Sequence, residues 1–245
     1  MTDSICSPPS FPLRPVNGGP LPQARPKRGH WRWEPKVNGW RAWVNTTGSR
    51  TSASPTGQVF NRKNEPLSIE REFAPILAKI KSAHLPMLWL DTEAFERRHP
   101  LGRGSLVLLD FAPGIYPGGY NLPPNMPLAQ RQLFMAEATN GLAVPWRFLH
   151  EPPPENELLF FAYTFSDYGI AAPTEADWLP DELRYQGEDI DGLHTGWRLM
   201  QAANRRLGVE LFEGLVAKRT DSQYPLQLRS PDQEFPFWMK HRWRF

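Results

Sequence analysis

The sequence predicts an α+β domain built on antiparallel sheets. Segments with strand-like and helix-like patterns are mixed along the chain, without the strict alternation that is typical of a parallel α/β fold. The 245 residues, 40% of them hydrophobic, are enough to bury one substantial core. Because no internal repeat or coiled-coil heptad is present, we expect one folded unit.

The composition argues against a membrane or secreted protein. No stretch approaches the roughly 18 consecutive apolar residues that a membrane span requires. The N-terminus lacks the basic and apolar segments of a secretory signal, and the single cysteine, Cys6, has no internal disulfide partner. We therefore expect a cytoplasmic location and no membrane partner.

Charge is distributed unevenly along the chain, although the formal net charge is only +2. Residues 1–50 hold eight Lys or Arg against two acidic residues, a net charge of +6. Residues 151–200 hold eleven acidic residues against two Arg, a net charge of −9. Such a chain would offer a phosphate backbone one attractive and one repulsive face. Solvated surface charge without a ligand explains either half taken alone.

The first thirty residues are expected to form an extended or disordered arm, and residues 31–245 the folded domain. The arm contains seven prolines, few large apolar side chains and no periodicity. It either grips a nucleic-acid duplex or is an untethered tail, and the sequence leaves both readings open.

Residues 31–46 open the folded domain with an alternation of aromatic and polar residues, which predicts two strands joined by a turn at Asn38 and Gly39. Glycine allows a tight turn, and asparagine tolerates a left-handed conformation there. Apolar side chains at helical spacing then predict an amphipathic helix over residues 68–83.

The remaining segments continue the mixture of strands and helices. Short apolar runs bounded by Pro or Gly predict buried strands, and longer runs with helical spacing predict helices. The expected strands cover residues 87–95, 105–111, 157–165, 210–220 and 234–245, and the expected helices residues 127–140 and 196–207. Between Asp110 and Leu128 a Pro- and Gly-rich loop is too long for a simple connection, so we expect a mobile lid or a binding loop.

Four short segments carry the candidate chemistry: EPKVNGWR (34–41), LDTEAF (90–95), EGLVAK (213–218) and WMKHRW (238–243). Each one alone is typical of an ordinary turn or strand entry. In this order and at this spacing they resemble the motif series of the ATP-dependent DNA and RNA ligases and mRNA capping enzymes. The resemblance covers about residues 31–245 and is strongest to bacterial ligases of the end-joining type.

The residue types in these segments also suit nucleotidyl transfer on chemical grounds. An amine attacks phosphorus only when it is neutral, and desolvation beside other cations favours a neutral Lys36. Carboxylates are needed beside a triphosphate to hold a divalent metal, and Glu93 and Glu213 are the candidates. Lysines and arginines neutralise the charge that develops on the phosphates, and the candidates are Lys218, Lys240 and Arg242.

The resemblance implies a fold, two cofactors and a role for each motif residue. The implied fold is an ATP-grasp-like nucleotidyltransferase (adenylation) domain of two antiparallel sheets with flanking helices, which binds ATP and Mg²⁺ or Mn²⁺ between the sheets. Lys36 would carry AMP as a phosphoramidate. The other implied roles are an adenine contact for Glu34, a ribose or nick contact for Arg41, a phosphate contact for Arg62, a ribose hydroxyl or metal contact for Glu93, base stacking at Leu109, metal binding for Glu213, and phosphate contacts for Lys218, Lys240 and Arg242.

Three positions differ from the family pattern. Asn38 stands where Asp is usual and so loses a charge. Arg242 ends a Lys-x-Arg string, Lys240-His241-Arg242, where Lys-x-Lys is usual, which keeps the charge and alters its geometry. Leu109 replaces the usual stacking aromatic side chain. Relatives continue into a small OB-fold domain, whereas this sequence ends at Phe245, so we expect no OB fold and one of three forms: a minimal ligase, a weak one, or a chain that works beside a protein partner.

The expected function is that of an AMP-forming polynucleotide ligase that seals nicked or broken duplexes, with DNA favoured over RNA. An RNA ligase or a GTP-dependent capping enzyme would share the same motifs. A catalytically weakened nucleic-acid-binding module is a third reading, and it predicts binding without a covalent adduct. The six histidines show no His-x-x-x-His pairing, which argues against a zinc site.

Overall fold

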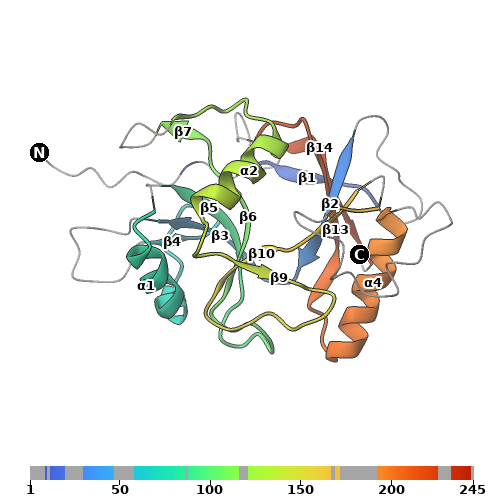
Figure 1. Ribbon diagram of the computed structural model, residues 1–245, viewed down its shortest axis with the longest axis horizontal. Helices are drawn as coiled ribbons and strands as arrows, with labels where there is room; N and C mark the ends of the chain where they lie inside the picture. The colour runs from blue at the N-terminus through green and yellow to red at the C-terminus, as the bar shows by residue number, and fades with distance from the viewer. Residues whose placement is uncertain are drawn as a thin grey trace, which may run out of the picture.

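Two six-stranded sheets form the centre of the computed structural model. Figure 1 shows them next to each other, with α1 beside one, α4 beside the other and α2 above the region between them. The structure describes residues 9, 12–19, 30–46, 58–85, 88–115, 121–166, 169–171, 192–225 and 233–243. The predicted mixed α+β class is confirmed.

The first sheet, here called sheet A, combines strands from both ends of the chain. Its order is β1 (Arg14–Asn17), β14 (Glu234–Arg242), β13 (Phe212–Arg219), β2 (Trp31–Val37), β11 (Thr164–Ser166) and β12 (Gly169–Ala171). The central strand β13 pairs antiparallel with β2 and β14, which places Gly214 opposite Lys36 on one side and opposite Arg242 on the other.

The second sheet, sheet B, is built from the middle of the chain. Its order is β4 (Val59–Phe60), β3 (Trp40–Asn45), β5 (Trp89–Ala94), β6 (Leu106–Phe111), β10 (Leu158–Phe161) and β9 (Val144–Trp146). A separate two-stranded ribbon of β7 (Gly114–Ile115) and β8 (Asn121–Leu122) lies in the predicted Pro- and Gly-rich loop, of which residues 116–120 fall outside the described part.

The prediction of antiparallel sheets holds for most strand pairs and is wrong for three. β10 pairs parallel with both β6 and β9, and β1 pairs parallel with β14. Between β6 and β10 the chain passes through α2, and such a long crossover is what returns a strand in the same direction.

The helices are α1 (Ala74–Ser82), α2 (Leu128–Ala138) and α4 (Gly192–Leu207), with a 3₁₀ turn η1 (Glu70–Phe73) before α1. The predicted amphipathic helix over residues 68–83 is confirmed, because Phe73, Ile76, Leu77 and Ile80 are buried. Its first turn is 3₁₀, and the proline near the start of α1 is tolerated because the first amides of a helix have no internal partner. In the part of the chain that the structure describes, every helix is too short or too polar to span a bilayer.

At two places the chain crosses from one sheet to the other where the sequence pattern predicted two strands joined by a turn or a single strand. The strands on either side of Asn38 and Gly39 are confirmed, but they join different sheets and do not pair with each other. Neither residue takes the left-handed conformation expected of the turn. Residues 157–165, predicted as one strand, divide between β10 in sheet B and β11 in sheet A.

Part of the predicted arm belongs to sheet A. β1 pairs with the C-terminal strand β14, and Gly18 donates its amide to the carbonyl of Lys240. Residues Arg14–Asn17 are therefore extended and attached to the sheet; most of the other arm residues lie outside the described part. The division into an arm and a domain remains a prediction.

Candidate functional site

A cavity of about 520 Å³ opens where strands of the two sheets face each other. All ten residues singled out from the sequence line it: Glu34, Lys36, Arg41, Arg62, Glu93, Leu109, Glu213, Lys218, Lys240 and Arg242. They come from β2, β3, β5, β6, β13 and β14 and from the segment that follows β4. The structure thus brings the whole predicted set together, while the chemical role of each residue remains a prediction.

A β-bulge places Glu213 beside Lys36. The register between β13 and β2 shifts between Phe212 and Gly214, so Glu213 is the extra residue of the bulge. Gly214 has a φ of 148°, and a side chain there would clash with the backbone carbonyl of His241. Lys36 Nζ forms an ion pair with Glu213 Oε2. The Glu-Gly pair of the motif therefore has a structural reason, since the glycine permits the bulge that aims the carboxylate at the amine.

Gly39 brings a second carboxylate to the same place. A Cβ atom on Gly39 would lie 2.8 Å from Glu93 Cγ and 2.9 Å from the carbonyl oxygen of Ala94. Close approach to β5, and not a left-handed turn, is thus what requires glycine here. Burial raises the pKa of Glu93 to about 7, against the opposing charges of Lys36 and Arg41. Glu93 therefore titrates near neutral pH in the ligand-free cavity.

Arg41 is fixed by a buried carboxylate under the cavity. Its Nε and Nη2 atoms lie 2.8 and 2.6 Å from the two oxygens of Asp91, which is fully buried. Tyr224 donates its hydroxyl to the same carboxylate at 2.8 Å. Burial alone would lower the pKa of Arg41, but the charge and hydrogen bonds of Asp91 outweigh it and raise this pKa. The guanidinium thus presents a permanent charge in a fixed direction.

Six cations line the cavity, and the part of its wall that they form is here called the phosphate end, after the ligand group proposed below: Arg14, Lys36, Arg62, Lys63, Lys240 and Arg242. Burial lowers the pKa of Arg62, and the neighbouring charge of Arg41 lowers it further. Burial, followed by the charge of Arg242, lowers the pKa of Lys240. Cations that lie close together around a cavity repel one another, which disfavours their charged forms. A bound anion would offset this repulsion.

Farther along β2 and β13 the cavity wall holds a buried ion pair, and this part is here called the base end, after the ligand group proposed below. Lys218 Nζ lies 2.6 Å from Glu34 Oε2, and the two side chains are only 4% and 5% exposed. The same amine donates to the carbonyl of Leu109 at 3.3 Å and lies 4.6 Å from the centroid of the Trp238 ring. Lys218 thus has protein partners around it, and its predicted phosphate contact stays a prediction.

The sequence analysis missed several residues of this cavity. Arg14 and Pro15 lie on β1, inside the predicted arm, and Val216 and Trp238 lie within the quoted motifs without having been assigned a role. Strand alternation could have pointed to Val216, which lies two residues from Lys218 on β13. No local pattern pointed to Arg14.

The donor set suits a metal ion that arrives with phosphate. Among the described residues, no group of three or more His, Cys, Asp or Glu is placed to hold a metal. Glu93 and Glu213 nevertheless line the same cavity. Because Mg²⁺ is usually bound by one or two carboxylates together with substrate phosphates and water, two carboxylates are sufficient for a metal that is shared with a triphosphate.

Comparison with known proteins places the fold. No protein-family model and no curated protein sequence matches the chain. Among solved structures, one named Pmar-Lig_Pre aligns with a TM-score of 0.52 at 14% identity, over 95% of this chain and 47% of that one. The ligase domain of LigD from M. tuberculosis aligns with a TM-score of 0.49 at 16% identity, over 94% of this chain and 59% of that one. Mycobacterial DNA ligase D complexed with ATP and MES aligns with a TM-score of 0.48 at 15% identity, over 94% and 60%.

The alignment with a TM-score above 0.5 shows a shared fold. The chain therefore shares the α+β fold of Pmar-Lig_Pre, and at the level of the fold this agrees with the resemblance drawn from the four motifs. The chain spans about half the length of the solved structures it matches.

Proposed function

We propose that the chain is an ATP-dependent polynucleotide ligase that acts on nicked or broken duplexes, with DNA as the favoured substrate and Lys36 as the residue that carries AMP. One observation supports this most strongly. Ten residues chosen from motifs as far apart as Glu34 and Arg242 line a single cavity between two sheets of the ligase-type fold. The proposal also includes the ligase activity, the nucleic-acid substrate, a protein partner and a cytoplasmic location.

The first chemical step joins AMP to Lys36. The Nζ atom loses a proton and attacks the α-phosphorus of ATP; an N–P bond forms while the bond to the β-phosphate oxygen breaks and pyrophosphate leaves. Glu213, the ion-pair partner of Lys36, orients the amine for this attack, and the proton leaves to water. Arg62, Lys240 and Arg242 lie at the same end of the cavity and would bind the phosphates and the leaving pyrophosphate.

Glu93 and Glu213 would hold the metal. Mg²⁺ or Mn²⁺ bound there with the triphosphate would supply further positive charge against the phosphate oxygens. In the two later transfers, AMP moves from Lys36 to a 5′-phosphate, and a 3′-hydroxyl then attacks that phosphate and releases AMP. Arg41 faces the cavity from the strand next to Glu93 and is the residue we assign to the ribose or the nick.

Covalent labelling tests the proposal directly. Incubation with α-radiolabelled ATP and Mg²⁺ is expected to label the wild-type protein, and Lys36→Ala to abolish the label. Lys81→Ala, on the exposed face of α1, is the matched control and should label normally. Equal labelling of Lys36→Ala would refute the nucleophile. Labelling by GTP in place of ATP would favour a capping-type enzyme, and binding of nicked duplex without any adduct would favour the weakened binding module.

A further inference from the structure

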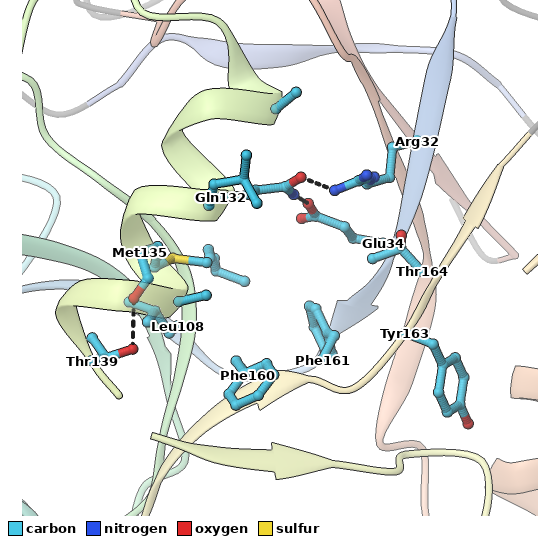
Figure 2. Close-up of a pocket in the computed structure, with 14 residues that line it drawn as sticks. Arg32, Glu34, Leu108, Gln132, Met135, Thr139, Phe160, Phe161, Tyr163 and Thr164 are labelled. Carbon is cyan, nitrogen blue, oxygen red and sulfur yellow. Dashed lines mark hydrogen bonds between the residues drawn. The ribbon is translucent and has the colours of Figure 1, made fainter. Parts of the chain in front are cut away.

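A second cavity, of about 400 Å³, lies between α2 and strands of both sheets and shares Glu34 and Leu109 with the first. Figure 2 shows its lining, with Phe160 and Phe161 on one side and α2 on the other. Apart from a small polar group at its rim, the lining is mostly apolar. Glu34 therefore lines both cavities, so a residue that holds its side chain can act from outside the first one, here called the nucleotide cavity after the proposed function.

The polar group at the rim is a chain of hydrogen bonds that reaches Glu34 from α2. Arg32 donates to Gln132 Oε1, and Gln132 Nε2 donates to Glu34 Oε1 at 3.1 Å, as the dashed lines in Figure 2 mark. Because the guanidinium can only donate, it fixes which end of the amide faces Glu34. Neither Arg32 nor Gln132 lines the nucleotide cavity.

The carboxylate of Glu34 is consequently held from two sides. Gln132 binds Oε1, and Lys218 lies 2.6 Å from Oε2. A carboxylate has about four acceptor positions, so capacity remains for another donor from the nucleotide cavity. A carboxylate accepts hydrogen bonds and donates none. A group placed against Glu34 must therefore present a donor.

The position of Glu34 indicates which part of a nucleotide it faces. Glu34 lies two residues before Lys36 on β2, on the same face of the strand and roughly 7 Å away along it. A carboxylate with this surrounding repels phosphate, whereas Leu109 and Val216 line the cavity with apolar surface suited to a flat base. The base edge is thus the part of a bound nucleotide that can approach Glu34.

We infer that Gln132, oriented by Arg32, is a positioning residue that holds Glu34 to accept a hydrogen bond from a base edge, and that it thereby selects adenine over guanine nucleotides. This inference rests on the proposed function. Adenine presents an amino donor at the position where guanine presents a carbonyl acceptor. A fixed carboxylate binds the first and repels the second, while a carboxylate free to rotate discriminates less, because it can turn away from the carbonyl.

The test compares Gln132→Met with Gln130→Met. Both residues lie on α2 and the chemical change is identical, but Gln130 is exposed to solvent. Initial rates of covalent labelling with radiolabelled ATP and with radiolabelled GTP give kcat/KM for each nucleotide. We expect Gln132→Met to lower the ATP-to-GTP ratio of kcat/KM about tenfold, mainly through a higher KM for ATP, as the loss of one hydrogen bond to a charged group implies. Gln130→Met should leave the ratio unchanged.

A further variant, Arg32→Met, separates an effect on nucleotide selection from an effect on folding. Arg32→Met leaves Gln132 in place but releases its amide, so the ratio should fall in the same direction by a smaller factor. A purely structural role predicts equal losses with both nucleotides at a constant ratio, and that result for both variants overturns the inference while leaving the ligase proposal intact. A wild-type protein that forms an adduct with neither nucleotide refutes the proposed function and this inference with it.

Discussion

The two ends of the nucleotide cavity differ in how their charges are balanced. At the base end, Glu34 and Lys218 neutralise each other while almost fully buried, and further protein groups bind both. At the phosphate end, Arg62, Lys240 and Arg242 outnumber their acidic neighbours and remain partly accessible. The base end resembles a protein core, whereas the phosphate end keeps an excess of positive charge that an anion would balance.

Under the proposed function, this difference separates two tasks of one cavity. A saturated, buried network holds its side chains in one arrangement, which suits selection among bases that differ by a single donor or acceptor. Cations in excess of their acidic neighbours are stabilised by an anionic ligand. This arrangement suits phosphates, because their charge and position change during transfer. We therefore expect substitutions at the base end to act on stability and selectivity, and substitutions at the phosphate end to act on catalysis.

Breaking the buried ion pair should have the largest effect on stability. Lys218→Met leaves Glu34 buried without its main partner, and we expect a loss of about 3–5 kcal/mol in the free energy of unfolding. Arg242→Met removes a cation whose side chain is 45% exposed, and the loss there should stay below about 1 kcal/mol. Urea unfolding of the two variants measures the contrast.

A second substitution sharpens this test. Changing Glu34 to Met in the Lys218→Met background removes the stranded charge and should restore most of the lost stability, because apolar residues of similar size often replace a buried ion pair without loss. Equal destabilisation by Lys218→Met and Arg242→Met would show that the two ends do not differ in the way described.

Local elements of this fold could be predicted from the sequence because their signals lie within a few residues. Burial of Ile76, Leu77 and Ile80 follows from helical spacing alone. The sheet that a strand joins cannot be predicted from such local spacing. The alternation on either side of Gly39 is the same whether the two strands pair with each other or with partners from residues 89–94 and 212–219. The crossings between sheets were missed for that reason.

The candidate site could be predicted where several motifs acted together, and not elsewhere. Lys36 and Glu213 are 177 residues apart, and only the order of motifs linked them before the structure placed them in contact. Gln132 belongs to no motif, and its position on α2 gives no sign of a contact with Glu34, 98 residues earlier. Arg14 was missed because a short, proline-flanked strand has too little pattern to be distinguished from an arm.

Glu93, which lines the same cavity, should give stability a pH dependence of intermediate size. Its pKa is about 7 in the folded protein, mainly because of burial, against a usual value of 4.5. Between these two pH values the folded state holds a proton that the unfolded state has lost, so this group's contribution to stability falls as the pH rises from about 4.5 through 7. After allowance for its partial exposure, we expect a loss of about 1–2 kcal/mol by pH 8 relative to Glu93→Gln.

Urea unfolding at pH 5 and pH 8 measures this difference. Glu93→Gln should lose less stability than the wild type over this interval, whereas Glu137→Gln, on the exposed face of α2, should follow the wild type. If the curves of Glu93→Gln and the wild type run parallel, the raised pKa is wrong.

The smallest change in stability is expected at the phosphate end, where its sign is informative. Burial and the neighbouring charge of Arg41 lower the pKa of Arg62, so the charged form is disfavoured in the ligand-free protein. Arg62→Met should therefore leave the free energy of unfolding unchanged or raise it by about 0.5 kcal/mol, within the range of surface substitutions. The same variant should lower the rate of covalent labelling by ATP about tenfold, because one charge-assisted phosphate contact is lost.

Arg98→Met, at an exposed position outside the cavity, is the control and should change neither quantity. A stabilised or unchanged fold combined with slower labelling is the outcome expected of a residue that the protein keeps for its ligand. Destabilisation by more than about 1 kcal/mol together with normal labelling would instead show that Arg62 has a structural role. The phosphate end of the cavity would then resemble the base end.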